Sequence, residues 1–439
     1  MKGKSTVAVF FFLIGWGYFS ALSQNLNLNM TGPGTRSMGM GGAFIGVADD
    51  ATAIYWNPAG PATIDYNYET LEEGEGMHLL LSGRNRSIQL KSETTLATFA
   101  SAFAPGFAGI LIPYKRSVLK GAPVSLGRFD PSIVFSAAYQ SATDANLFTI
   151  NQTSASITEN LKSALNLSTA SLSAAYQLSP YMSVGLTANY WFALGNKFEY
   201  SSTEQPANVV RGEQGKYKIS GLNFIGGVMF DFYENNVPLR IGARVSTPFS
   251  LRNQFLSEGN VQASDLQTRI SRSYDQKYKM PFTAGVGVAY RPFWRVMLTA
   301  DAEVLPYQGQ AIQQTFFDYN QFNSLNPSRG VPLLIDLPQR STIAKDNHYQ
   351  LRGGGEFFLL DSPQFELRVM GGYRMQSYLN NDGTSSKAKS FSFGATLFFD
   401  RFKIHGAFEQ MKYPQGTSTS INQYTRSYLS IDFIMLLRS

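Results

Sequence analysis

The sequence predicts an all-β protein: a transmembrane antiparallel β-barrel of about 14 strands with an N-terminal hatch, or plug, inside the lumen. Three observations lead to this prediction. Two-faced strand segments recur from about residue 76 to the C-terminus, the links between them alternate between short and long, and the N-terminus reads as an export signal. Short periplasmic turns alternating with long outer loops are typical of bacterial outer-membrane barrels.

The composition favours a barrel and disfavours other classes. Charged residues make up 15% of the chain and aromatic residues 14%, with no cysteine. The low charge is unlike a soluble domain, and the rings suit the interfacial girdles of a barrel. The formal charge is +6, but the basic residues are scattered and match no nucleic-acid motif, so we expect no nucleic-acid partner.

The first residues resemble a secretory signal peptide. Lys2 and Lys4 precede an apolar stretch from Val7 to Leu22, and the small residues that end at Ser23 suit a signal peptidase. We therefore predict a signal peptide over 1–23, a hatch over 24–75 and a barrel over 76–439. The predicted location is the bacterial outer membrane, which the chain crosses many times.

Apolar and polar residues alternate along the strand segments. Leu239, Ile241 and Val245 share one face of the segment 239–246, whereas Arg240 and Arg244 share the other. The same division recurs at 181–192, 295–304, 364–374 and the last strand. An arginine on the lipid face costs about 2–4 kcal/mol at the bilayer midplane, so we place the arginines in the lumen. These candidate partners for a ligand carboxylate are Arg240, Arg244, Arg352, Arg368 and Arg374. A soluble sheet with its polar face in water is the alternative.

The links fall into two sets. Tight links occur at 179–180, 291–293, 360–363 and 400–401, and long links at 142–165, 200–214, 253–277 and 310–345. The first strand is either 78–90 or 94–104. Ile157, Leu161 and Leu165 have helical spacing, which predicts a short amphipathic helix in the first long link.

The stretch before the first strand is rich in glycine and is not strand-like. Asp49 and Asp50 can cap a short helix, or they can form salt bridges from the hatch to lumen arginines, and the two roles can coexist. Asn57-Pro58 indicates a turn.

The run from Gly39 to Gly60, above all 48–51 and 57–60, resembles the hatch of the outer-membrane long-chain fatty acid transporters of the FadL type. The segments 281–285, 301–303, 351–356 and 367–373 are similar to paired late strands of that family. The resemblance implies a 14-stranded barrel with a hatch, ligand capture by outer loops, a lumen site and lateral release through a gap in the wall. The hatch or gating candidates are Asp49, Asp50, Asn57, Pro58 and Gly60.

Apolar clusters in the long links are candidates for ligand capture, because exposed clusters of this kind often mark contacts. The candidates are Leu161, Phe316, Phe317, Leu333, Leu334 and Ile335. Alternatively, they pack on one another and hold the loop closed. An apolar pocket with one arginine would suit an amphipathic acid.

No catalytic chemistry is predicted. His78, His348 and His405 are not spaced as metal ligands, and we expect no metal and no cofactor. Asp301 and Glu303 share a face, where a ladder of charges is a better interpretation than an acid–base pair.

The sequence therefore predicts passive transport of hydrophobic or amphipathic molecules, with long-chain fatty acids as the expected ligand. Its partners would be that ligand and outer-membrane lipid. The alternative is a barrel that shuttles secreted proteins and has a protein partner, since the opening at 39–42 resembles such barrels.

Overall fold

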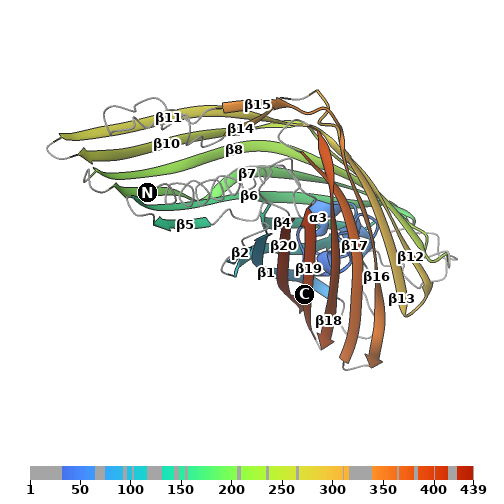
Figure 1. The fold of residues 1–439 in the computed structure, drawn as a ribbon. Helices are drawn as coiled ribbons and strands as arrows, with labels where there is room; N and C mark the ends of the chain where they lie inside the picture. The colour runs from blue at the N-terminus through green and yellow to red at the C-terminus, as the bar shows by residue number, and fades with distance from the viewer. Residues whose placement is uncertain are drawn as a thin grey trace.

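The computed structural model describes most of the chain, and its strands curl around a short N-terminal segment (Figure 1). The described residues are 32–64, 75–91, 96–100, 103–115, 131–142, 148–153, 157–204, 209–233, 237–263, 266–309, 311–315, 339–362, 365–379, 384–399, 401–413 and 423–438. Within these ranges, no helix has both the length and the apolar character needed to cross a bilayer.

The wall is a closed antiparallel barrel of 14 strands. In ring order, the first six are β1 (Glu75–Lys91), β3 (Ala104–Lys115), β4 (Ile133–Ser141), β6 (Ile157–Ser179), β7 (Met182–Glu204) and β8 (Val209–Asp231). The last six are β13 (Val296–Leu305), β16 (His348–Ser362), β17 (Phe365–Leu379), β18 (Ser385–Phe399), β19 (Phe402–Tyr413) and β20 (Gln423–Arg438). The ring closes where β1 pairs with β20, for example at Leu80 and Ile434.

Two wall strands between these sets are interrupted. β9 (Leu239–Ser246) continues as β10 (Phe249–Ala263), and β11 (Leu266–Met280) continues as β12 (Thr283–Phe293). Each break falls at a proline, Pro248 or Pro281, which has no N–H to donate to the ladder. β9 and β10 both pair with β8, so the two pieces occupy one position in the ring.

Four short strands lie outside this count. β2 (Leu96–Ala100) pairs with β1, and β5 (Phe148–Thr153) pairs with β6. β14 (Ala311–Thr315) and β15 (Gln339–Ile343) form a separate hairpin. The first wall strand is thus the earlier of the two predicted candidates. The tight links predicted at 179–180, 360–363 and 400–401 fall where one wall strand ends and its neighbour begins, whereas 291–293 is the end of β12 and the turn follows at 294–295.

The predicted faces are confirmed. On β9, Ile241 and Val245 are exposed, whereas Arg244 is buried; on β13, Leu298 is 50% exposed and Asp301 only 4%. On β20, Leu429 and Ile431 are exposed, whereas Ser430 and Asp432 are buried. The exposed apolar side chains form an outer band that suits lipid, with the charged side chains inside.

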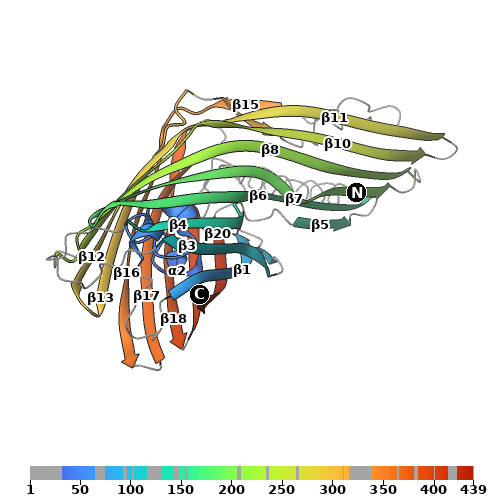
Figure 2. The same ribbon diagram turned by 180° about the vertical axis from the view of Figure 1, so that it is seen from behind.

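Several predicted loops are strands instead. The link 253–277 is largely the β10–β11 hairpin, 200–214 is mostly the ends of β7 and β8, and β6 begins at Ile157. The predicted helix over 157–165 is therefore wrong. Pairing with β7 and β5 on both sides, as at Leu161 with Tyr200 and Ile150, outweighs a weak helical spacing. These strands extend well beyond the rest of the barrel wall (Figure 1, Figure 2).

Residues 32–64, here called the inner segment, lie within the ring (Figure 2). The segment contains helices α2 (Thr35–Gly39) and α3 (Ala53–Trp56) and the 3-10 helix η2 (Gly60–Thr63). Met40, Phe44, Ile45 and Trp56 are buried with wall residues of β12, β13 and β17. Ala51, Ile54 and Ala62 pack on β1, β3, β4 and β20. The segment thus fills the lumen by contact with opposite sides of the wall.

Candidate functional site: the inner segment and the pocket above it

The inner segment is fixed to the wall by an ion pair that joins it to β16. The Arg36 guanidinium donates to Glu356 on β16 at 3.1 and 2.9 Å and to Asp49 of the same segment at 2.5 Å. The side chains of Arg36 and Glu356 are 7% and 1% exposed. Because Arg36 and Glu356 are buried and Asp49 is partly buried, loss of Arg36 would leave the buried charge of Glu356 without its closest partner.

Asp49 and Asp50 take different roles. Burial tends to raise the pKa of Asp49, but the Arg36 charge outweighs this effect and holds it at about 2. Burial, and next the charge of Asp49, raises the pKa of Asp50 to about 6. Asp50 accepts hydrogen bonds from the backbone N–H and the hydroxyl of Thr52, next to α3. Among the residues that the structure describes, no side chain caps α3 by a hydrogen bond, and the salt-bridge partner of Asp49 is Arg36 of the inner segment instead of an arginine of the wall.

Asn57, Pro58 and Gly60 hold the segment against β7, β8 and β9. The Asn57 amide donates to the backbone oxygens of Ile45 at 3.2 Å and Val228 on β8 at 3.0 Å. A Cβ on wall glycine Gly185 would come within 2.1 Å of the Pro58 oxygen, so the backbones meet there directly. A Cβ on Gly60 would collide with Ala48, whose φ of 34° marks a tight turn.

The candidate lumen arginines point inward, and each already has a carboxylate partner of the protein. Arg244 and Arg352 both donate to Glu303, each at 2.5 Å. The other pairs are Arg240 with Asp231, Arg368 with Glu356 and Glu366, and Arg374 with Glu409. Asp301 accepts the N–H groups of Phe44 and Ile45 at 2.7 and 2.9 Å. Asp301 and Glu303 therefore anchor the inner segment and the arginines, as a ladder of charges would.

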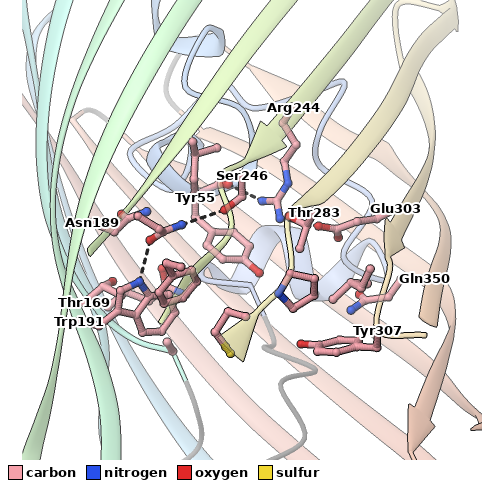
Figure 3. Close-up of a pocket in the computed structure, with 18 residues that line it drawn as sticks. Tyr55, Thr169, Asn189, Trp191, Arg244, Ser246, Thr283, Glu303, Tyr307 and Gln350 are labelled. Carbon is pink, nitrogen blue, oxygen red and sulfur yellow. Dashed lines mark hydrogen bonds and ion pairs between the residues drawn. The ribbon is translucent and has the colours of Figure 1, made fainter. Parts of the chain in front are cut away.

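A pocket lies in the lumen next to Tyr55 of the inner segment (Figure 3). Its walls combine rings and apolar side chains, namely Trp191, Ile225, Phe249, Met280, Leu305 and Tyr307. Hydroxyl and amide side chains, including Asn189, Asn223, Thr283 and Gln350, complete it. In Figure 3, Trp191 and Tyr307 lie on opposite sides of the view, with Arg244 and Glu303 nearby.

Hydrogen bonds and ring contacts fix these pocket side chains. The Trp191 indole donates to Asn223 at 2.7 Å, and Asn223 donates to Ser246 at 2.8 Å. The rings of Trp191 and Phe249 stack with centroids 5.4 Å apart. The Arg244 guanidinium lies 4.8 Å from the Tyr55 ring centroid and donates to the Tyr55 backbone oxygen at 2.5 Å. The pocket is thus preformed, and Arg244 joins its wall to the inner segment.

The structure describes only part of the predicted ligand site. Phe316, Phe317, Leu333, Leu334 and Ile335 lie outside the described residues, and for Leu161 only the backbone is described. Sequence reasoning missed Arg36, Tyr55 and Trp191. Arg36 is the one charged residue in the glycine-rich run 32–44, and this isolation could have marked it as a functional residue. Trp191 lies among other aromatic residues of a strand, and nothing in the sequence distinguishes it from them. In the described ranges, no group of three or more His, Cys, Asp or Glu side chains could hold a metal ion.

Together, the closed ring, the outer apolar band and the filled lumen define an outer-membrane β-barrel fold with an internal N-terminal segment.

Solved structures of FadL-type channels have folds similar to that of this chain. The Pseudomonas putida toluene transporter TodX matches with a TM-score of 0.60 at 12% identity, over 93% of this chain and 99% of that one. A Pseudomonas aeruginosa FadL homologue matches with a TM-score of 0.56 at 13% identity, over 93% and 99%. The monoaromatic hydrocarbon channel CymD matches with 0.55 at 13%, over 94% and 99%. No family model and no curated protein matches the sequence. The chain therefore has the fold of FadL-type channels.

Proposed function

We propose that this protein is a passive outer-membrane channel for hydrophobic or amphipathic small molecules. The pocket beside Tyr55 carries the proposal, because it combines rings, apolar side chains and a few polar groups inside the lumen. The similar structures support it, since their names describe toluene transporters and a monoaromatic hydrocarbon channel.

Long-chain fatty acids are the ligand that we propose within this class. An apolar tail gains about 0.8 kcal/mol for each buried methylene group, and an arginine can bind the carboxylate. Arg244 lines the pocket, and both Arg244 and Arg352 form ion pairs with Glu303. Two positive guanidinium groups therefore face one negative carboxylate there. Asp301, which lies on the same strand face, offsets part of this positive charge. A neutral aromatic hydrocarbon would use the rings and would not need Arg244.

Binding to the purified protein separates the two ligands. We expect Trp191→Ala to weaken binding of oleate and of toluene alike, by roughly tenfold or more, because a large buried ring is lost. Arg244→Gln should weaken oleate binding alone. The matched control is Arg269→Gln, which removes an arginine that is 74% exposed on β11. Equal loss of both ligands in Arg244→Gln would reject the carboxylate role, and no loss in Trp191→Ala would reject the pocket.

We further propose that the inner segment acts as the hatch and that Asp49, Asp50, Asn57, Pro58 and Gly60 take part in gating. Its contacts with opposite sides of the wall support this role. Removal of residues 24–60 should increase leakage of small hydrophilic solutes from liposomes. Unchanged leakage would argue against a hatch. Lateral release through the wall stays a prediction.

A protein shuttle is the competing function. Detergent-extracted protein should contain bound fatty acid or hydrocarbon if it is a channel. A stoichiometric protein partner without small ligand would favour the shuttle.

A further inference from the structure

A patch of positive charge lies on the outward face of the extended strands β7, β8, β10 and β11. It contains Lys197, Lys216, Lys218, Arg252, Lys277 and Lys279, here called the basic patch, and five of the six are lysines. All six are exposed. On this face of the described residues, the neighbouring acidic side chains are Glu199, Glu258 and Asp275. Asp275 is bound to Arg252 at 2.5 Å, and Glu258 is bound to Arg269 at 2.9 Å. The patch therefore keeps a surplus of positive charge.

Strand register brings these residues together from distant parts of the sequence. Lys216 on β8 lies opposite Lys197 on β7, and Arg252 on β10 lies opposite Lys277 on β11. Gln254 on β10 joins the two halves, because it lies opposite Lys218 on one side and Asp275 on the other. Successive residues on one face of a strand are about 7 Å apart and neighbouring strands about 4.8 Å apart, so the basic patch extends over roughly 25 Å from Lys197 to Lys279. Within it, the two residues of each opposed pair are close enough to share one phosphate group.

The two directly opposed pairs are unfavourable in the protein alone. Like charges opposite each other in a sheet destabilise it, whereas opposite charges stabilise it. Lys197 with Lys216 and Arg252 with Lys277 are both of the first kind, and Asp275 relieves only the second. A bound anion would remove this repulsion.

The position of the patch indicates which anion. On the same face of β8, the exposed apolar residues Leu222 and Phe224 begin four residues beyond Lys218, about 13 Å along the strand. On the β11–β12 strand, exposed Phe282 follows Lys279 by three residues, about 10 Å. The basic patch thus borders the outer apolar band, on the side of the long hairpins and not of the tight turns. A lipid whose chains cover this band would place its headgroup at the patch.

We propose that the basic patch binds a phosphate-bearing lipid headgroup of the outer leaflet. Lysines at a membrane surface attract anionic headgroups, and exposed ammonium groups bind phosphate as point charges. The bound lipid would hold the extended strands β7, β8, β10 and β11 against the membrane. This site is separate from the lumen pocket and does not depend on the transported ligand.

Titration of the detergent-solubilised full chain with lipid A, followed by native mass spectrometry and thermal unfolding, tests the proposal. The variant Lys216→Gln/Lys277→Gln removes one lysine from each opposed pair. The matched control Arg269→Gln/Lys345→Gln removes the same charge from exposed positions outside the patch. Each basic residue near an anionic surface contributes about fivefold in affinity, so we expect the variant to bind lipid A roughly twentyfold more weakly. The control should bind like the wild type.

Thermal unfolding adds a result that simple damage to the fold would not give. Without lipid, the variant should unfold at the same temperature as the wild type or higher, because repulsion is relieved. With lipid A, only the wild type and the control should gain stability. Should the variant unfold early, Lys218→Gln/Lys279→Gln serves as a second test, because it leaves both opposed pairs in place.

Two further experiments distinguish a lipid phosphate from a soluble phosphate as the bound group. Inorganic pyrophosphate should neither stabilise the wild type nor displace lipid A. If it stabilises the protein as well as lipid A does, the patch binds a soluble anion and the lipid proposal is wrong. Equal affinity of wild type and variant for lipid A, or an affinity that salt does not change, would also overturn it.

Discussion

Two adjacent glycines of β17 offer a sharp test of how the inner segment is seated. A Cβ on Gly372 would lie 2.1 Å from the Gly41 backbone nitrogen and 2.2 Å from the Met40 carbonyl carbon, both in the inner segment. A Cβ on the neighbouring Gly371 would meet nothing within 4 Å. Gly372→Ala should therefore displace the inner segment, and Gly371→Ala should not.

The structure sets the size of the effect. An ordinary carbon–nitrogen contact needs about 3.4 Å, so the two backbones must separate by roughly 1.3 Å. Gly41 donates its N–H to Ser392 at 3.0 Å, and Ser392 lies opposite Gly372 on β18. That separation would stretch this hydrogen bond beyond its useful range. Overpacking costs about 1–3 kcal/mol and the lost hydrogen bond about 1 kcal/mol, which gives roughly 2–4 kcal/mol in total.

Liposome leakage and protease cleavage within residues 32–64 measure the displacement. A loss of this size raises the population of the displaced segment by a factor of roughly 30 to 1000. We expect Gly372→Ala to leak and to be cleaved faster, and Gly371→Ala to behave as the wild type does. If both alanine variants match the wild type, the close approach of the backbones is not as described. If both leak equally, the effect comes from strand glycines in general.

Two further predictions concern the charges of the inner segment. Arg36→Met should weaken the attachment of the inner segment by about 3–5 kcal/mol, because Glu356 stays buried without a partner from that segment. Arg269→Met, in an exposed pair with Glu258, should cost under about 1 kcal/mol. Urea unfolding and leakage measure both losses, and equal losses would contradict a buried attachment. Burial raises the pKa of Asp50 to about 6, above its ordinary value of 3.8, so its ionisation should lower stability as pH rises from about 4 to 6. Asp50→Asn should remove this slope in thermal unfolding measured over that range, while the contribution of Asp49, whose pKa is about 2, is lost only below about pH 4.

Much of the barrel could be predicted from the sequence because alternation is a local property. Residues such as Leu298 and Asp301 show which face meets lipid from their order alone, since side chains in a strand point to opposite sides. Three of the four tight links were equally readable from proline and short polar runs, but β12 continues through Pro292 to Phe293 before the chain turns.

The links read as long loops show where local reasoning fails. Polar residues in 200–214 and 253–277 predicted loops, yet they form paired strands because neighbouring strands supply the hydrogen bonds. The helical spacing of Ile157, Leu161 and Leu165 failed for the same reason. Strand pairing joins residues far apart in the chain, and no single segment records it.

The sequence by itself determined a wall of alternating strands, inward arginines and a glycine-rich leading segment. Only the tertiary structure decided that Arg36 pairs with Glu356 across 320 positions of sequence and that Arg244 joins Tyr55 to Glu303. The physical reason is that a charge buried in a lumen needs a partner, while the choice among many inward carboxylates depends on strand register and on where the inner segment rests.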